Sequence, residues 1–180
     1  MFNDRSSAEL ESHFAALARS AAAGGSSATA LATLLHIGDE HLVVLSGSGA
    51  TPDTVRRIEL GRARIARDFF HHDPPTSREI ERAIDFVEDE IMRLGKPAED
   101  GTTLWVTGLD MRAWAAIPGR TVPIETVEQW FQRLAAALRG QPGSIPAGRE
   151  AAATLLILRE FMHHLGYPAI TVADAARTQD

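Results

Sequence analysis

The sequence predicts an α/β domain with a mixed five-stranded sheet and helices on both faces. Short apolar runs rich in β-branched residues come early in the chain, and longer segments with three- and four-residue apolar spacing alternate with further short runs after them. A helix that connects two successive strands crosses over the sheet, so the two strands that it joins are parallel. The 180 residues, of which 44% are hydrophobic and 23% charged, are enough for one buried core.

A helix is expected over residues 7–23, because apolar residues recur there at helical spacing. Gly24-Gly25-Ser26-Ser27 ends this pattern and provides a flexible joint. We therefore divide the chain into an amphipathic N-terminal helix with its linker, residues 1–27, and a main domain, residues 28–180.

Three strands in a meander are expected next. Two apolar runs, residues 30–37 and 41–46, are separated by Gly38-Asp39-Glu40, which predicts a β-hairpin. After a loop rich in Gly and Ser, residues 54–60 alternate loosely and predict a third, more exposed strand.

The rest of the main domain alternates between helices and strands. Thr76 and Glu79 form a capping box that opens a helix ending near Leu94. Apolar spacing predicts further helices at Met111–Ile117, Glu125–Leu138 and Arg149–Leu165, the last one buried, and strands at residues 102–107 and 167–173.

Composition excludes several classes of function. Eighteen Lys and Arg against 24 Asp and Glu give a net charge of -6, which disfavours attraction to nucleic acid or anionic lipid. The absence of cysteine excludes disulfides, thiolate zinc sites and a cysteine nucleophile. No leader or membrane-spanning run is expected from the sequence, so we expect a cytoplasmic protein without nucleic-acid or membrane partners.

Several short motifs are grouped in the main domain. Residues 58–76 contain Leu60-Gly61-Arg62-Ala63-Arg64 and Asp73-Pro74-Pro75-Thr76, and Thr171-Val172-Ala173-Asp174 follows the last helix. These motifs resemble the Leu-Gly-x-x-Arg segment, the Asp-Pro-Pro-Thr helix start and the Thr-Val-Ser-Asp strand of the exopolyphosphatase and guanosine pentaphosphate phosphohydrolase (Ppx/GppA) family. The resemblance covers residues 30–177, and it implies one lobe, the second, of the actin-like, ribonuclease H-like fold.

The resemblance also implies that parts of the family's phosphate site are missing. Family members close two lobes over a cleft, and the first lobe, for which this chain is too short, supplies a catalytic Glu. The second lobe's Asp-Ile-Gly-Gly-Gly-Ser loop corresponds here to His36-Ile37-Gly38-Asp39-Glu40-His41, and the Gly-Gly-Thr loop corresponds to Thr107-Gly108-Leu109. Gly38 and Gly108 are therefore the remaining candidates for phosphate binding, whereas the two carboxylates beside Gly38 would repel phosphate.

Asp39 and Glu40 are also candidate ligands of Mg²⁺, because hard cations prefer carboxylate oxygen. The alternative is that they are ordinary solvated residues of a turn. The adjacent histidines at 71–72 and 163–164 lack the i, i+4 spacing of a helical zinc site. No cofactor is expected apart from this candidate Mg²⁺.

Arg62, Arg64 and Arg67 are candidate phosphate ligands. They belong to a group of five arginines within residues 56–67 of an otherwise acidic chain. If the third strand continues past Gly61, Arg62 and Arg64 share one side and form an anion-facing patch. The alternative is a solvated strand face.

The sequence favours a non-catalytic or regulatory relative of the family that binds a phosphate-rich small molecule or a protein partner, as a homo-oligomer. The alternative is a phosphohydrolase of polyphosphate or guanosine polyphosphates whose cleft is completed by a second copy or another subunit. The missing glycines and lobe favour the first hypothesis, and the arginine group keeps the second open. A third interpretation is an unrelated α/β domain with local similarity.

Overall fold

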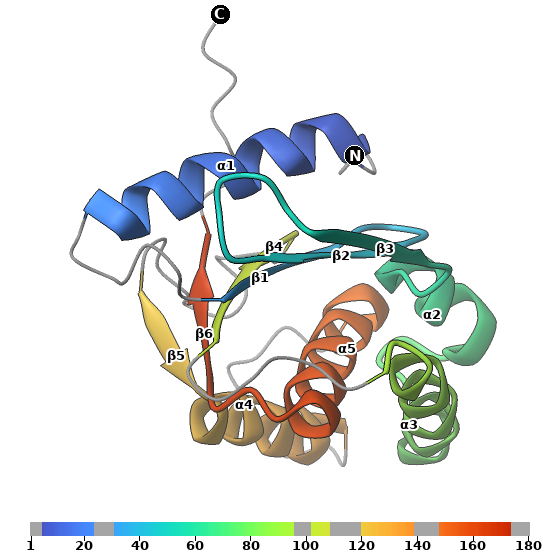
Figure 1. Cartoon of the computed structure of the whole chain (residues 1–180). Coiled ribbons are helices and arrows are strands. Elements are labelled where there is room, and N and C mark those ends of the chain that lie inside the picture. The colour runs from blue at the N-terminus through green and yellow to red at the C-terminus, as the bar shows by residue number, and fades with distance from the viewer. Residues whose placement is uncertain (1–4, 24–30, 96–101, 109–119, 139–147, 174–180) are drawn as a thin grey trace, which may run out of the picture.

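The computed structural model describes residues 5–23, 31–95, 102–108, 120–138 and 148–173. These residues form one mixed sheet with helices on both faces (Figure 1). The strands are β1 (Ala32–Ile37), β2 (Leu42–Gly47), β3 (Thr54–Ile58), β4 (Thr103–Thr107), β5 (Thr121–Pro123) and β6 (Ala169–Val172). The helices are α1 (Ser7–Ala23), α2 (Arg62–Phe69), α3 (Ser77–Met92), α4 (Ile124–Leu138) and α5 (Arg149–Leu165).

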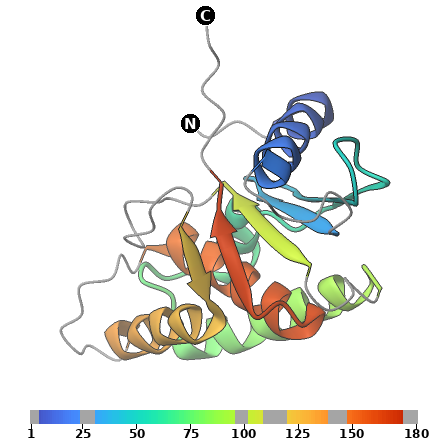
Figure 2. The same cartoon turned by 60° about the vertical axis from the view of Figure 1, so that its left-hand side comes forward.

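The strand order β3-β2-β1-β4-β6-β5 places β1 and β4 in the middle of the sheet (Figure 2). β1 is antiparallel to β2 and parallel to β4, and β4 is parallel to β6. Since His36 of β1 pairs with Thr107 of β4, the two strands end side by side. The turns that begin at Gly38 and Gly108 therefore leave the sheet at the same place.

Helix α5 forms the centre of the larger core, between the sheet and helices α2, α3 and α4. Its residues Leu155, Leu156, Ile157, Leu158 and Phe161 are all buried. The sequence predicted a buried helix here, because the middle of the helix is apolar on most sides. The structure confirms that prediction.

Helix α1 covers the opposite face of the sheet (Figure 1). Leu10 and Phe14 are fully buried and belong to a second core cluster with Leu34, Leu45 and Trp105. The rings of Phe14 and Trp105 meet edge to face, with centroids 5.9 Å apart. The apolar stripe of α1 is therefore buried within its own chain.

Most predicted elements are confirmed. The helices at 7–23 and 149–165 have the expected bounds, and the crossover strands are parallel. The predicted helix Met111–Ile117 lies outside the described residues. None of the described helices has the length and apolar content needed to cross a membrane.

Two features of the elements differ from the expectations: the number of strands, and the condition that the third strand continues past Gly61. In the described ranges the sheet has six strands rather than five, because β5 adds a three-residue edge strand that pairs with β6. The chain after Gly61 does not continue the third strand, because β3 ends at Ile58 and α2 begins at Arg62. The buried apolar residues of α2 are Ile65 and Ala66. Two such residues do not make an apolar repeat at helical spacing, so the sequence did not predict this helix.

The predicted capping box at the start of α3 is present, and it extends to the preceding turn. Glu79 Oε2 accepts hydrogen bonds from the backbone N–H and hydroxyl of Thr76, and Glu79 Oε1 accepts one from the backbone N–H of His71 at 2.8 Å. His72 Nδ1 lies 2.9 Å from the same Oε1 atom. Burial raises the pKa of Glu79, but these hydrogen bonds outweigh it and lower the pKa from 4.5 to about 2.

Replacing Glu79 by glutamine is expected to destabilise the protein by about 2 kcal/mol at pH 7, since hydrogen bonds to a charged acceptor are lost. Because the pKa is depressed in the folded state, the stabilisation by Glu79 is complete above pH 4.5 and is lost as the pH falls toward 2. Urea unfolding at pH 7, 4 and 3 should therefore show a difference between wild type and variant that shrinks with pH. Glu81→Gln, at an exposed position of the same helix, is the matched control. A difference that is constant across this range would contradict the assignment.

Candidate ligand site at the end of the sheet

The ends of β1 and β4 form the candidate site, because ligands of α/β sheets bind beyond the carboxyl ends of the strands. Gly108 follows β4 with φ of +83°, and a Cβ there would overlap the carbonyl oxygen of Ile37. A Cβ on Gly61 would likewise overlap the carbonyl group of Asp39. The two glycines therefore let three backbone segments touch at this end of the sheet.

The first turn of α2 binds the β1–β2 turn through its backbone. Arg62 N donates to the carbonyl oxygen of Gly38 at 3.0 Å, and the N–H groups of Ala63 and Arg64 both donate to that of Asp39, at 2.9 and 3.2 Å. Gly38 N donates to the carbonyl oxygen of His41 at 2.9 Å. The amides that would suit an anion, at a helix start and a glycine turn, are thus bonded within the chain.

The Arg62 side chain points into the end of the sheet, and the residue is only 7% exposed. Its Nη1 donates to the carbonyl oxygens of Gly108, at 2.8 Å, and of Ile37, at 3.3 Å, and its Nη2 binds the carboxylate of Asp39. Nε lies 3.8 Å from a carboxylate oxygen of Glu150, in the first turn of α5. We call these five residues the Arg62 site. It joins β1, β4, α2 and α5 through one guanidinium group.

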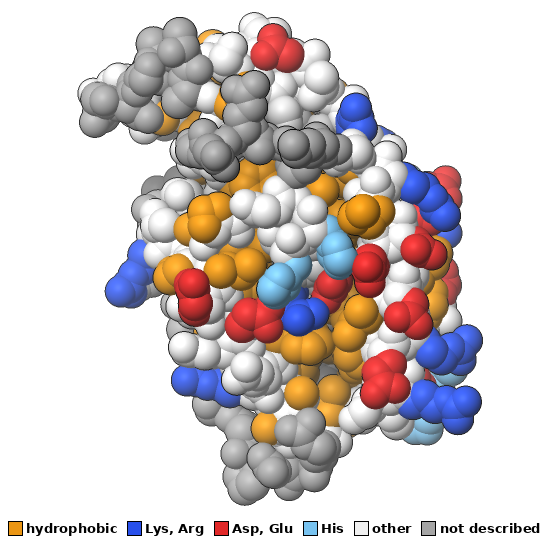
Figure 3. All heavy atoms as spheres, turned by 60° about the horizontal axis from the view of Figure 1, so that its bottom comes forward, with side chains coloured by type: hydrophobic (Ala, Val, Ile, Leu, Met, Phe, Trp, Pro, Cys, Tyr) orange, Lys and Arg blue, Asp and Glu red, His pale blue; other side chains and the backbone are white. Residues whose placement is uncertain are grey.

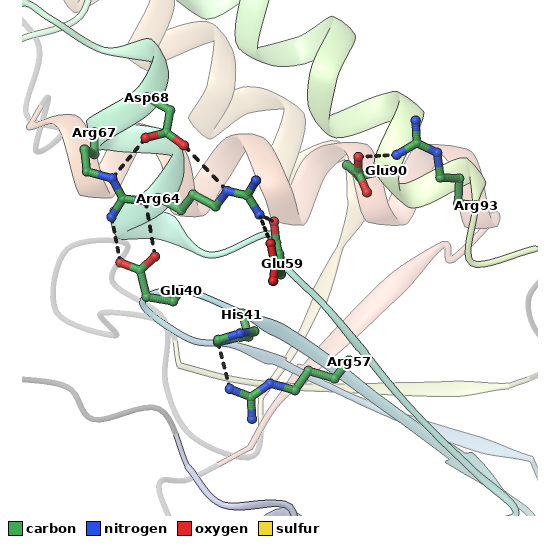
Figure 4. Close-up of polar contacts among 9 residues, drawn as sticks. All are labelled: Glu40, His41, Arg57, Glu59, Arg64, Arg67, Asp68, Glu90 and Arg93. Atoms are coloured by element: carbon green, nitrogen blue, oxygen red, sulfur yellow. Dashed lines mark hydrogen bonds and ion pairs between the residues drawn. The ribbon is translucent and has the colours of Figure 1, made fainter.

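Arg64 and Arg67 lie outside this site, in a row of alternating charges (Figure 4). Arg67 binds Glu40 at 2.8 Å and Asp68 at 3.0 Å, and Arg64 binds Glu59 at 3.1 Å and Asp68 at 3.5 Å. The hydrogen bonds that Arg67 donates, first to Glu40 and then to Asp68, raise the pKa of its guanidinium group. The three predicted arginines therefore do not converge, because the helix directs Arg62 inward and the other two toward neighbouring carboxylates. Their phosphate binding stays a prediction.

The predicted Mg²⁺ ligands diverge in the same way. Asp39 binds Arg62, whereas Glu40 binds Arg67. Within the described ranges, no group of three or more His, Asp or Glu side chains is placed to hold a metal ion. As arranged here, these residues do not fit a bound Mg²⁺, which needs several oxygen ligands around one point.

The two histidines at the end of α5 contact different helices. His163 Nε2 binds Glu128 of α4, while His164 Nε2 lies 3.3 Å from Glu160 and 3.7 Å from Glu88 of α3. Burial alone would raise the pKa of Glu128. The hydrogen bonds from His163 and Arg159 outweigh burial, so the pKa is lowered. Figure 3 shows this helical side of the molecule, where acidic, basic and histidine side chains are interspersed rather than gathered into one basic surface. These contacts join the helices and provide no shared metal site.

Sequence reasoning missed the inward position of Arg62 and the part that Glu150 has in the site. Both depend on α2, which turns Arg62 toward the strand ends, and on α5, whose first turn carries Glu150. Arg62 is one of several arginines in its segment. Glu150 lies in the first turn of a helix, where acidic residues are common because they favour the helix dipole. Neither residue therefore carries a local signal of its role.

Comparison of the sequence with models of protein families and with curated proteins finds no match. Solved structures do match. A Ppx/GppA phosphatase from Aquifex aeolicus, in its type II variant, shares 19% identity with a TM-score of 0.71 over 92% of this chain and 59% of its own. An exopolyphosphatase-like protein shares 11% identity with a TM-score of 0.69 over 92% of this chain and 62% of its own. An exopolyphosphatase from Cytophaga hutchinsonii shares 12% identity with a TM-score of 0.60 over 81% of this chain and 53% of its own.

At these identities the comparisons establish the fold, and they confirm the predicted actin-like lobe with one strand more than expected. The chain spans about three-fifths of the length of the Aquifex aeolicus structures that it matches. The fold of this protein is thus similar to that of part of the Ppx/GppA structures, as the sequence resemblance implied.

Proposed function

We propose that this protein is a non-catalytic relative of the Ppx/GppA enzymes that acts by binding a partner. The observation that supports the proposal is the Arg62 site. There a buried guanidinium and two carboxylates occupy the space at the ends of β1 and β4. In a sheet of this type, that is where a ligand would approach the backbone.

The chemistry of phosphoryl transfer explains why this arrangement opposes catalysis. The reaction depends on metal ions and hydrogen-bond donors that stabilise the charge of the transferred group. Here the amide of Gly38 is bonded to His41, and the charge of Arg62 is balanced by Asp39 and Glu150. Because these donors are engaged within the chain, we assign no catalytic residue.

The partner that we propose is a second copy of the chain, in the cytoplasm. The absence of cysteine fits a reducing compartment. Because Leu10 and Phe14 of α1 are buried on their own sheet, the contact between copies would use a surface other than the apolar stripe of α1. A protein partner or a phosphate-rich small molecule is the other binding function open to this fold.

One observation favours the enzymatic alternative. In this alternative, a second copy or another subunit completes the cleft of a phosphohydrolase of polyphosphate or guanosine polyphosphates. The observation is that Arg64, which occupies the arginine position of the Leu-Gly-x-x-Arg pattern, is partly exposed. Polyphosphate binding at low salt that is lost in an Arg64→Ala/Arg67→Ala variant would support this alternative.

The test is phosphate release from polyphosphate, ATP and guanosine pentaphosphate in the presence of Mg²⁺, with protein whose mass has been measured by light scattering. We expect no release above a protein-free blank, and a mass above that of one chain. Release that disappears in an Asp39→Ala variant would overturn the non-catalytic proposal. A monomeric mass at tens of micromolar would overturn the proposed self-association.

A further inference from the structure

Helix α4 leaves part of its apolar stripe accessible. It lies at one edge of the helical layer, with α5 beside it (Figure 1). Val127 and Leu134 are its buried residues. Trp130 and Leu138 pack against the same core but remain partly exposed. The outer surface of α4 therefore has apolar area at its border.

The three charged residues of α4 differ in their contacts. Glu128 binds Arg159 and His163 of α5. Glu125, in the first turn, and Arg133 are exposed, and neither has a hydrogen bond or an ion pair with another residue in the part of the chain that the structure describes. The two lie on one face of the helix, about 12 Å apart along its axis.

This face of α4 is complementary to itself when two helices run antiparallel. The exposed Gln129 lies midway between Glu125 and Arg133. A two-fold axis through Gln129 places Glu125 of each copy opposite Arg133 of the other. The two Gln129 amides then meet, and each carries both donors and an acceptor. We infer that α4 is the contact between two copies of the chain, paired antiparallel with α4 of the second copy, with the partly exposed Trp130 supplying apolar area.

The other helix surfaces suit a second copy less well. The exposed charged residues of α3 are Arg78, Glu81, Arg82, Asp85 and Asp89. Acidic residues outnumber basic ones there, so two copies of this surface would repel each other. The exposed arginines of α2 are paired with carboxylates of their own chain, and the apolar stripe of α1 is buried on its own sheet.

This inference rests on the self-association proposed above, and it adds the surface, the symmetry and the size of the assembly. An isologous contact uses the same surface of both copies, so each α4 is occupied once. The assembly therefore closes at two copies.

The first experiment measures the dissociation constant of the dimer by sedimentation equilibrium for wild type, Glu125→Arg and Arg133→Glu. Each variant sets like charges opposite each other twice across the axis, so we expect the constant to rise by about tenfold or more. An equimolar mixture of the two variants should recover the wild-type constant, because every pair then joins opposite charges. Arg82→Glu on α3 changes the net charge as Arg133→Glu does, and it should associate like wild type.

The second experiment uses the absence of cysteine from the chain. Gln129→Cys places one thiol at the two-fold axis, where a disulfide between copies has the short span that it needs. Mild oxidation should therefore give a covalent dimer of this variant. Asp85→Cys, at an exposed position of α3, is the matched control and should stay largely uncrosslinked. Far-UV circular dichroism verifies that each variant is folded.

The outcomes separate this inference from the proposed function. If wild type associates but the charge variants have the same dissociation constant, or the two cysteine variants cross-link equally, the α4 contact is wrong and self-association stands. Weak association of both charge variants without recovery in their mixture would overturn the antiparallel pairing. A wild type that is monomeric at tens of micromolar would overturn both the contact and the self-association. Phosphate release would overturn the non-catalytic proposal alone.

Discussion

Replacing Arg62 by alanine is expected to lower the free energy of unfolding by about 3–5 kcal/mol, because it leaves buried acceptors without their charged donor. The carbonyl oxygens of Ile37 and Gly108 and the carboxylate of Asp39 would lose a partner together. Urea unfolding followed by circular dichroism measures the change, and the midpoint should move without a change of slope.

Arg64→Ala is the matched control, because it removes an arginine two residues away on the same helix. Arg64 pairs with Glu59 and Asp68 near the surface, and such exposed pairs contribute only about 0–1 kcal/mol. Similar losses in the two variants would mean that burial at the end of the sheet gives Arg62 no special role.

Replacing Gly108 by alanine should destabilise the protein by about 4 kcal/mol. A positive φ costs a side-chain-bearing residue about 1–2 kcal/mol, and crowding of a packed site adds about 1–3 kcal/mol. At Gly108 φ is +83°, and the new Cβ would overlap the carbonyl oxygen of Ile37, which is backbone and cannot swing away. The same unfolding measurement checks this value.

Gly95→Ala separates the two causes. Gly95 has a similar φ of +76°, but the nearest atom to its added Cβ is Arg56 Nη1, at 3.9 Å, on a side chain that can move. We expect this control to cost only about 1–2 kcal/mol. If both variants lose the same amount, the close approach of β1 and β4 at Gly108 does not contribute to stability.

Local patterns were sufficient to predict most of the fold. The capping box at Thr76 and Glu79 acts over three residues, and the apolar spacing of residues 149–165 is a property of that segment alone. By contrast, β5 has three residues and exists because it pairs with β6, about fifty residues later in the chain. A strand of this kind depends on tertiary pairing, so its own residues do not mark it.

The site was harder to predict for the same reason. Its position, at the ends of the strands that precede Gly38 and Gly108, followed from the order of the elements and from the family resemblance. The direction of Arg62 did not, because α2 is held by hydrogen bonds from its first N–H groups to the carbonyl oxygens of Gly38 and Asp39. Charged residues at the start of a short helix give no sign of which one will be buried.

The strand order also bears on aggregation, because an open sheet edge is a template for pairing with another chain. In the described part of the protein, β3 and β5 are the two outer strands. β3 carries Arg56 and Arg57 in succession, and β5 is three residues long and ends in Pro123, which has no N–H to donate. Both features hinder growth of the sheet into a fibre. Copies of this chain that associate are therefore directed toward contacts between side-chain surfaces, which can close at a defined number of subunits.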